Sequence, residues 1–108
     1  MSFVTSAQLP ARALAPFPGI TGRYVHLERM SLSDVARAAS VVVPSHQNPH
    51  EQVSYVLSGR LEFNVGDETR VMAAGDCALI PCGAPHGCHA LTDCRVLDLV
   101  CPVREDYR

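Results

Sequence analysis

The sequence predicts one small all-β domain, built as a barrel or a sandwich of short strands. Two observations carry this prediction: the length of the chain, and the regular alternation of strand-forming runs with turns. With 108 residues, the chain has the size of a single domain. From Gly22 onward, short runs rich in β-branched and aromatic residues are separated by turns that contain glycine or aspartate. Several short strands joined by short turns are typical of barrels and sandwiches.

The strands are expected where the apolar pattern is clearest. They cover residues 24–32, 53–57, 61–65, 70–73, 77–80, 86–91 and 95–100. In the second of these, Val53, Tyr55 and Leu57 share one face, because successive side chains of a strand point to opposite faces. Tyr55 is expected either to pack in the core or to contact a substrate. The stretch 34–43 is ambiguous, since its first half favours helix and its second half favours strand.

Residues 1–18 are expected to form an extended N-terminal arm, ahead of a main domain over residues 19–108. The arm contains three prolines, which exclude a long helix. It is too poor in apolar residues to build its own core, and a barrel this short leaves sheet edges unpaired. We therefore expect a homodimer in which the arm adds to the sheet of a second copy and buries Phe3, Leu14 and Phe17.

The charge of the chain excludes several classes of partner. Its 9 basic and 11 acidic residues give a net charge of −2, without the basic excess typical of proteins that bind nucleic acid or anionic membranes. No apolar run reaches the roughly 20 residues that a membrane-spanning helix needs. No secretory signal is recognisable, so a cytoplasmic protein is expected. All nine basic residues are arginines, which excludes chemistry that depends on a lysine.

The five cysteines lie in the last third of the chain. An odd number of cysteines without a secretory signal indicates free thiols, and we expect most of them to be buried as small apolar residues. Whether Cys88 lines a pocket is left open. The cysteines are Cys77, Cys82, Cys88, Cys94 and Cys101.

Three histidines are placed where a metal site could form. His46 and His50 lie in a loop that leads into the strand 53–57, and His86 begins a later strand after the turn 81–85. Imidazoles on separate strands of a small barrel can converge on a transition metal. The alternative is that all three are exposed loop residues. The spacing alone leaves both interpretations open.

The segment 75–86 resembles the second sequence motif of the cupin superfamily, G-x5-P-x-G-x2-H-x3-N. Gly75, Pro81, Gly83 and His86 match this motif, while the residue at the final asparagine position is an alanine. The resemblance implies the cupin fold, which is a double-stranded β-helix, or jelly-roll, barrel.

The segment 40–59 resembles the first cupin motif, G-x5-H-x-H-x3,4-E-x6-G, less closely. His46 matches its first histidine and the final glycine is also present. Asn48 stands at the second histidine and Gln52 at the glutamate. Both motifs occur in the right order, so the chain is identified as a cupin with an N-terminal arm.

Within this superfamily, residues 50–59 and 98–107 resemble the pectin-degradation, KdgF-like cupins, which carry a glutamine at the usual glutamate position. This resemblance implies the metal-assisted conversion of an unsaturated uronate to its open-chain keto form. It implies a divalent transition metal (Ni, Zn, Mn or Fe) held by His46, Gln52 and His86. At the fourth position Asn48 replaces a histidine, and an asparagine amide is a poor ligand for such a metal. His50 could take this position instead, or it could contact the substrate or lie exposed in the loop.

The same resemblance implies two catalytic residues. Asp98, in the strand 95–100, would transfer a proton between an enol oxygen and a carbon. Arg104 would also bind the substrate, by pairing with a uronate carboxylate. Val100 takes the place of the usual phenylalanine at the substrate. The alternative is that Asp98 faces solvent and that Arg104 forms a surface ion pair.

Three functions are compatible with these residues, each with a small-molecule ligand. The first is a metal-dependent isomerase or tautomerase of a small oxygenated acid, such as an unsaturated uronate. The second is a cupin cyclase or dioxygenase of secondary metabolism. The third is a metal-poor cupin that binds a ligand without converting it.

Overall fold

The fold is that of a computed structural model, which describes residues 2–14 and 17–103. Within these ranges, ten strands and one short 3₁₀ helix follow one another. They are η1 (Ser6–Gln8), β1 (Arg12–Ala13), β2 (Ile20–His26), β3 (Ser31–Arg37), β4 (Val42–His46), β5 (Glu51–Ser58), β6 (Leu61–Val65), β7 (Glu68–Met72), β8 (Cys77–Ile80), β9 (His86–Ala90) and β10 (Cys94–Cys101).

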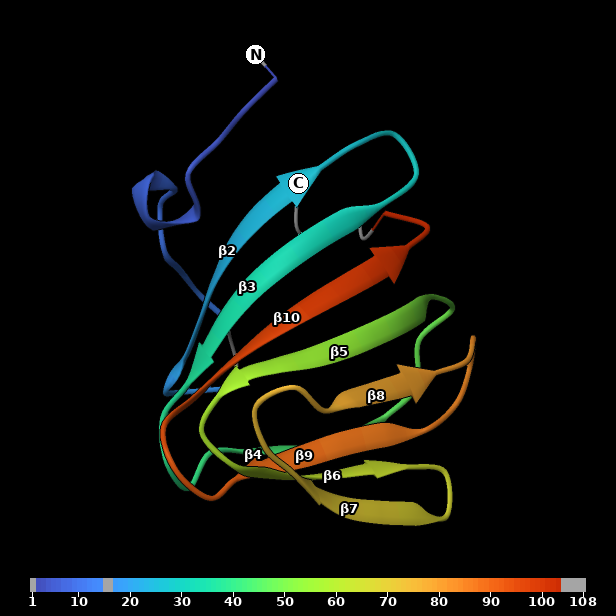
Figure 1. The fold of residues 1–108 in the computed structure, drawn as a ribbon. Helices are drawn as coiled ribbons and strands as arrows, with labels where there is room; N and C mark the ends of the chain where they lie inside the picture. Colours follow the sequence, from blue (N-terminus) through green and yellow to red (C-terminus); the bar gives the residue numbers. More distant parts are fainter. Residues whose placement is uncertain (1, 15–16, 104–108) are drawn as a thin grey trace.

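The strands form two sheets that face each other (Figure 1). The larger sheet has six strands in the order β1-β2-β3-β10-β5-β8, and the smaller has four in the order β4-β9-β6-β7. All pairs are antiparallel. The all-β prediction and the jelly-roll prediction are both confirmed. Within the described ranges no helix is long and apolar enough to cross a membrane.

Two strands depart from the expected boundaries. The expected strand 24–32 is a hairpin, in which β2 ends at His26 and β3 begins at Ser31, and the Leu27 N–H donates to the Met30 carbonyl at 2.8 Å. The ambiguous stretch 34–43 contains the end of β3 and the start of β4. The half whose composition favours helix forms part of β3, because both neighbouring strands, β2 and β10, pair with it. Such pairing outweighs local propensity.

The space between the sheets has an apolar part and a polar part. The apolar core consists of Val56, Leu61, Phe63, Met72, Ala78, Ile80, Cys88, Ala90, Cys94 and Val96. The buried polar side chains come from β3, β5, β9 and β10, and they are Ser31, Ser33, Arg37, Ser54, His86 and Asp98. A polar set this large inside a small domain indicates a site, because buried polar groups weaken a core unless they are paired.

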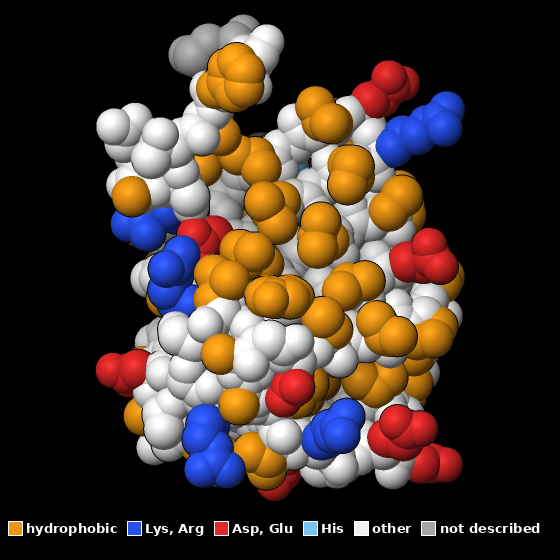
Figure 2. Space-filling view, in the orientation of Figure 1, with side chains coloured by type: hydrophobic (Ala, Val, Ile, Leu, Met, Phe, Trp, Pro, Cys, Tyr) orange, Lys and Arg blue, Asp and Glu red, His pale blue; other side chains and the backbone are white. Residues whose placement is uncertain are grey.

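The outer face of the six-stranded sheet is apolar (Figure 2). One row of directly opposed side chains crosses five strands, with Leu99 of β10 at its centre. The row consists of Val25, Leu32, Leu99, Val53 and Leu79. Leu79 is 70% exposed and Leu99 is 37% exposed. We call this surface the outer row; its leucines Leu79 and Leu99 are in contact with water.

The N-terminal arm adds to a sheet of its own chain. In β1, Arg12 and Ala13 pair with Gly22 and Thr21 of β2, and the Ser6 hydroxyl donates to the Asp34 carboxylate at 2.7 Å. The sequence predicted instead that the arm pairs with a second copy. The difference arises because the edge of β2 is within reach of the chain's own arm.

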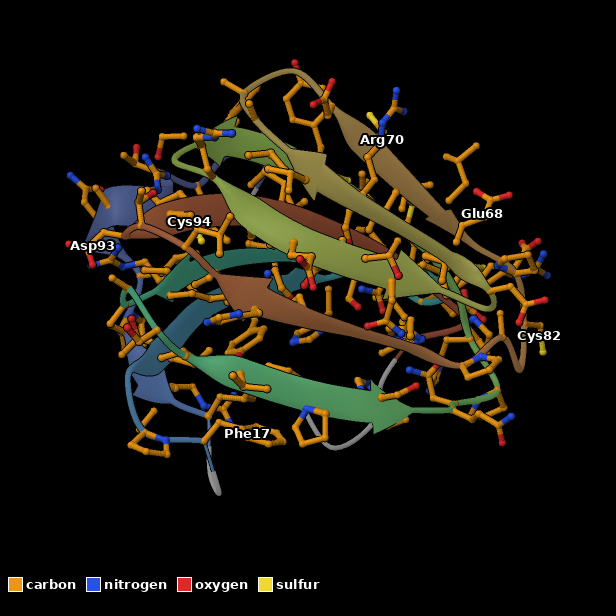
Figure 3. All side chains as sticks on the ribbon, turned by 90° about the horizontal axis from the view of Figure 1, so that it is seen from below. Phe17, Glu68, Arg70, Cys82, Asp93 and Cys94 are labelled. Atoms are coloured by element: carbon orange, nitrogen blue, oxygen red, sulfur yellow. The ribbon has the colours of Figure 1, made fainter. Side chains whose placement is uncertain are left out.

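Only two of the five cysteines are buried, Cys88 and Cys94, and all five are free. The expectation that most are buried is therefore wrong. Figure 3 shows Cys94 between the sheets and Cys82 in a loop at the opposite end. Two of the exposed cysteines, Cys77 and Cys101, occupy outward strand positions, and each is next to a buried position of its strand.

Candidate metal and substrate site

A cavity of about 610 Å³ opens between the two sheets. It is lined by inward side chains of β2, β3, β4, β5, β9 and β10, and also by residues of the N-terminal arm. His46, Gln52 and His86, which the sequence predicted as metal ligands, all line it. The cavity is therefore the candidate functional site.

The two histidines lie opposite each other on paired strands. His46 ends β4 and His86 begins β9, their positions pair directly, and their ring centroids are 4.3 Å apart. In each ring Nδ1 lies 3.0 Å from a backbone carbonyl oxygen, that of Pro44 for His46 and that of Ala84 for His86. Since a carbonyl only accepts hydrogen bonds, Nδ1 carries the proton and Nε2 carries the lone pair. This tautomer is the one that binds metals through Nε2.

Gln52 supplies the third donor group, from β5. Its Nε2 donates a hydrogen bond to the Ser54 hydroxyl at 3.0 Å. The described residues contain no group of three or more His, Cys, Asp or Glu side chains that could hold a metal ion. A metal site here therefore needs the neutral oxygen of the Gln52 amide in addition to the two imidazoles, and an amide oxygen is a ligand that divalent metals accept.

Both candidates for a fourth ligand are placed less favourably than His46 and His86. Asn48 lines the cavity, but its Oδ1 accepts the backbone N–H of His50 at 3.1 Å. Its Nδ2 is buried and has no hydrogen-bond partner within the described part of the chain. An amide NH₂ group does not bind a metal. The His50 ring is outside the cavity lining, and its Nδ1 lies 2.8 Å from the Pro102 carbonyl oxygen.

Asp98 lies inside the barrel, on β10. Its carboxylate is nearly buried, with Oδ1 accepting a hydrogen bond from the Ser54 hydroxyl at 2.6 Å and Oδ2 3.7 Å from the Arg37 guanidinium. Asp98 thus faces the cavity rather than solvent. A carboxylate held between a hydroxyl and a guanidinium is fixed in its orientation, as a proton-transferring group requires.

Sequence reasoning missed Arg37, which is the last residue of β3. Its side chain is 9% exposed and lines the cavity, and its Nε and Nη1 have no acceptor among the residues described. No motif includes this position. The signal was present in the alternation of β3, because Ser31, Ser33, Val35 and Arg37 all face inward, but three polar residues in such a pattern resemble a solvent-facing strand.

The walls of the cavity correct one prediction. Val100 lines the cavity, whereas Tyr55 is 39% exposed and outside the lining. Tyr55 points outward because Gln52, Ser54 and Val56 occupy the inward positions of β5, so Tyr55 neither packs in the core nor reaches this cavity. Arg104 lies outside the described residues.

The arm and β2 add further lining that the sequence did not reveal. Leu14, Phe17 and Tyr24 line the cavity, and the Arg12 guanidinium lies 5.3 Å from the centroid of the Tyr24 ring. Figure 3 shows Phe17 beside β4. The arm is thus a wall of the site.

Cys88 also lines the cavity. Burial raises the pKa of its thiol, and the nearby Arg37 charge only partly offsets this. The thiol is therefore neutral at neutral pH in the metal-free protein, and it does not act as a ready thiolate ligand.

Residues 37–100 match the Cupin domain family. The chain belongs to the cupins. It is 43% identical over 56 residues to H2HPP isomerase of Bacillus subtilis, and 41% identical over 59 residues to an uncharacterized protein of Streptomyces coelicolor. These matches cover 51% and 52% of this chain, but 24% and 56% of the two relatives, so each comparison concerns only part of those proteins.

Two solved cupin structures superpose on this one over its whole length. KdgF from Halomonas sp. has a TM-score of 0.93 and 29% identity, and the match covers 100% of this chain and 99% of that one. An RmlC-like cupin from Shewanella frigidimarina also has a TM-score of 0.93, with 24% identity and 100% and 96% coverage. The second likeness shows the fold alone. The predicted likeness to KdgF-like cupins is confirmed.

Proposed function

We propose that this cupin is a metal-dependent isomerase or tautomerase of a small oxygenated acid, such as an unsaturated uronate. The observation that carries the proposal is the convergence of His46, Gln52, His86 and Asp98 on one cavity. The likeness to KdgF over the whole chain and the partial match to H2HPP isomerase support it.

The donor set fits a divalent transition metal. Nε2 of His46, Nε2 of His86 and Oε1 of Gln52 would hold it. When bound by three neutral donors, such an ion keeps its full positive charge and polarises a carbonyl or enol oxygen. Nickel, zinc, manganese and iron all accept imidazole ligands, and these residues do not select among them.

Asp98 would carry out the proton transfer. Its carboxylate would take the proton from the hydroxyl oxygen of the enol as the carbonyl forms, and would return that proton to the neighbouring carbon. The reaction is then a redistribution of one proton and one double bond, without an oxidant or a reductant. The partly apolar walls around Val100 and Phe63 would limit access of water to the reacting carbon. Arg104 remains the predicted partner of the substrate carboxylate.

The test combines metal analysis with an assay on an unsaturated uronate. The protein is expected to bind one divalent ion and to convert the unsaturated uronate to a keto form, followed by nuclear magnetic resonance (NMR). The variant D98N should keep the metal but lower kcat about 100- to 10,000-fold, the usual contribution of a positioned acid–base group. A metal-loaded wild type that converts neither this substrate nor related enols would contradict the proposal.

A second candidate function is a cyclase or a dioxygenase, and the apolar part of the cavity wall favours it. Leu14, Phe17, Val35 and Val100 offer a surface suited to a less polar substrate. Oxygen uptake with such a substrate would identify the dioxygenase. A protein that retains no metal after loading would support the third candidate, a ligand-binding cupin. The orientation of the Asn48 amide, whose Oδ1 accepts the backbone N–H of His50, also favours this candidate.

We further propose that the protein is a homodimer through the outer row. A row of apolar side chains across five strands is unusual on a surface that stays in contact with water. In a two-fold dimer the same patch lies on both sides of the interface, so a second copy would cover it. The cytoplasmic location also remains a prediction.

A further inference from the structure

A chain of hydrogen bonds joins the candidate metal ligand on β5 to the candidate acid–base group on β10. Gln52 Nε2 donates to Ser54 Oγ at 3.0 Å, and Ser54 Oγ donates to Asp98 Oδ1 at 2.6 Å. Ser54 and Asp98 lie directly opposite each other on paired strands. Ser54 is fully buried, with 0% of its surface exposed, so no water competes for its hydroxyl.

The direction of both hydrogen bonds follows from the chemistry of the groups. The Asp98 carboxylate, paired with Arg37, can only accept. The single hydroxyl proton of Ser54 must therefore point to Asp98, and the hydroxyl offers Gln52 only a lone pair. Only the NH₂ group of the Gln52 amide can face that lone pair. The orientation of the Gln52 amide thus follows from the donors and acceptors around it.

We propose that Ser54 is a positioning residue that turns the Gln52 amide so that Oε1 is presented to the cavity. This inference rests on the proposed role of Gln52 as a metal ligand. An amide can bind a metal through its oxygen but not through its NH₂ group. Without Ser54 the amide would rotate between both orientations, and binding would have to select the productive one at a cost in affinity. Asp98 thereby orients a ligand that it does not touch.

The neighbouring strand provides a matched control. Ser33 of β3 lies directly opposite Asp98 on its other side and is 1% exposed. Its hydroxyl has no hydrogen-bond partner in the described part of the chain. The substitutions S54A and S33A thus remove the same group from equally buried positions on either side of one carboxylate, and only the first removes a link to Gln52.

The first experiment uses metal-free wild-type protein. NMR measures hydrogen exchange of the side-chain amides of Gln52 and of the exposed Gln8. We expect slow exchange for Gln52 and fast exchange for Gln8, because only the former donates to a buried hydroxyl. Equally fast exchange would overturn the inference. This measurement needs neither a bound metal nor a variant that folds.

The second experiment measures the affinity of Zn²⁺ alone by calorimetry. Loss of a group that orients a metal ligand typically lowers metal affinity about 10- to 100-fold, so S54A should show a loss in this range. S33A should match the wild type, and S54T, which keeps a hydroxyl, should recover most of the affinity. Wild-type affinity in S54A would overturn the role of Ser54. If wild-type protein binds no metal, the proposed function fails and the exchange measurement alone decides the orientation of the amide.

Discussion

Gln52 is the proposed neutral metal ligand, and its amide is oriented by a hydrogen bond to Ser54. Replacing it with glutamate changes both its charge and this hydrogen bond. The variant Q52E places an anionic donor beside the two imidazoles, so metal binding should be retained or tightened. Turnover should fall, because an anionic ligand reduces the pull of the metal on the substrate oxygen. A carboxylate also cannot donate to the Ser54 hydroxyl, which would then lie between two carboxylates.

The measurement is metal content together with kcat and KM. The variant Q8E adds the same charge on the exposed arm and should behave like the wild type. If Q52E were fully active, the Lewis-acid role of a metal bound by neutral donors would lose its most specific support.

Sequence reasoning at this scale found residues inside motifs and missed those outside them. His46, His86, Gln52 and Asp98 were named from spacing and resemblance. Other inward polar positions, Arg37 above all, belong to no motif, and a buried polar residue looks like a surface residue until its strand has been oriented. The orientation of the Asn48 amide was beyond reach as well, since it depends on one backbone N–H of the following loop.

At the scale of elements, strands bounded by glycine or aspartate turns were predicted, and others were not. The hairpin between β2 and β3 turns through Leu27, Glu28, Arg29 and Met30, which include none of the usual turn residues. The sequence analysis therefore predicted one continuous strand over residues 24–32. β1 is only two residues long and exists because it pairs with an edge, so no local pattern could reveal it.

The attachment of the arm to the sheet is expected to depend on pH through Asp34. Burial by itself would raise the pKa of Asp34, but the hydrogen bond from Ser6 and the pairing with Arg95 outweigh it and lower this pKa below 3.8. Because the folded state favours the ionised form, Asp34 stabilises the fold at neutral pH. That contribution is lost as the pH falls from about 4 through the lowered pKa.

The variant D34N should therefore be less stable than the wild type at pH 7, and the difference should vanish in strong acid. We expect a difference of up to about 1 kcal/mol, because Arg95 is half exposed and water screens the pair. Urea denaturation at both pH values measures it, and D67N, in an exposed turn, is the control. A difference that persists unchanged in acid would show that the pairing of Asp34 is not its cause.

At the scale of the whole molecule, the barrel separates two surfaces. Inward positions of the six-stranded sheet carry Gln52 and Asp98 of the site, and outward positions carry the outer row. Since β10 and β5 contribute to both, the strands that would hold the dimer together also carry Asp98 and Gln52. The sequence predicted a dimer from the arm alone. The sequence did not reveal the outer row, because its five residues come from five separate strands.

The proposed dimer can be tested by placing a charge in the outer row. Burying one leucine contributes about 1.5–3 kcal/mol, and in a two-fold interface each substitution acts twice. The wild type should therefore have the mass of a dimer at micromolar concentration in light scattering, and L79E should have the mass of a monomer. The variant L91E changes a leucine that is 44% exposed in the turn after β9, and it should remain dimeric. Deletion of the arm should also leave a dimer, because β1 pairs within its own chain. A monomeric wild type would refute the dimer. A dimer that is lost only when the arm is deleted would show that the arm, and not the outer row, forms the interface.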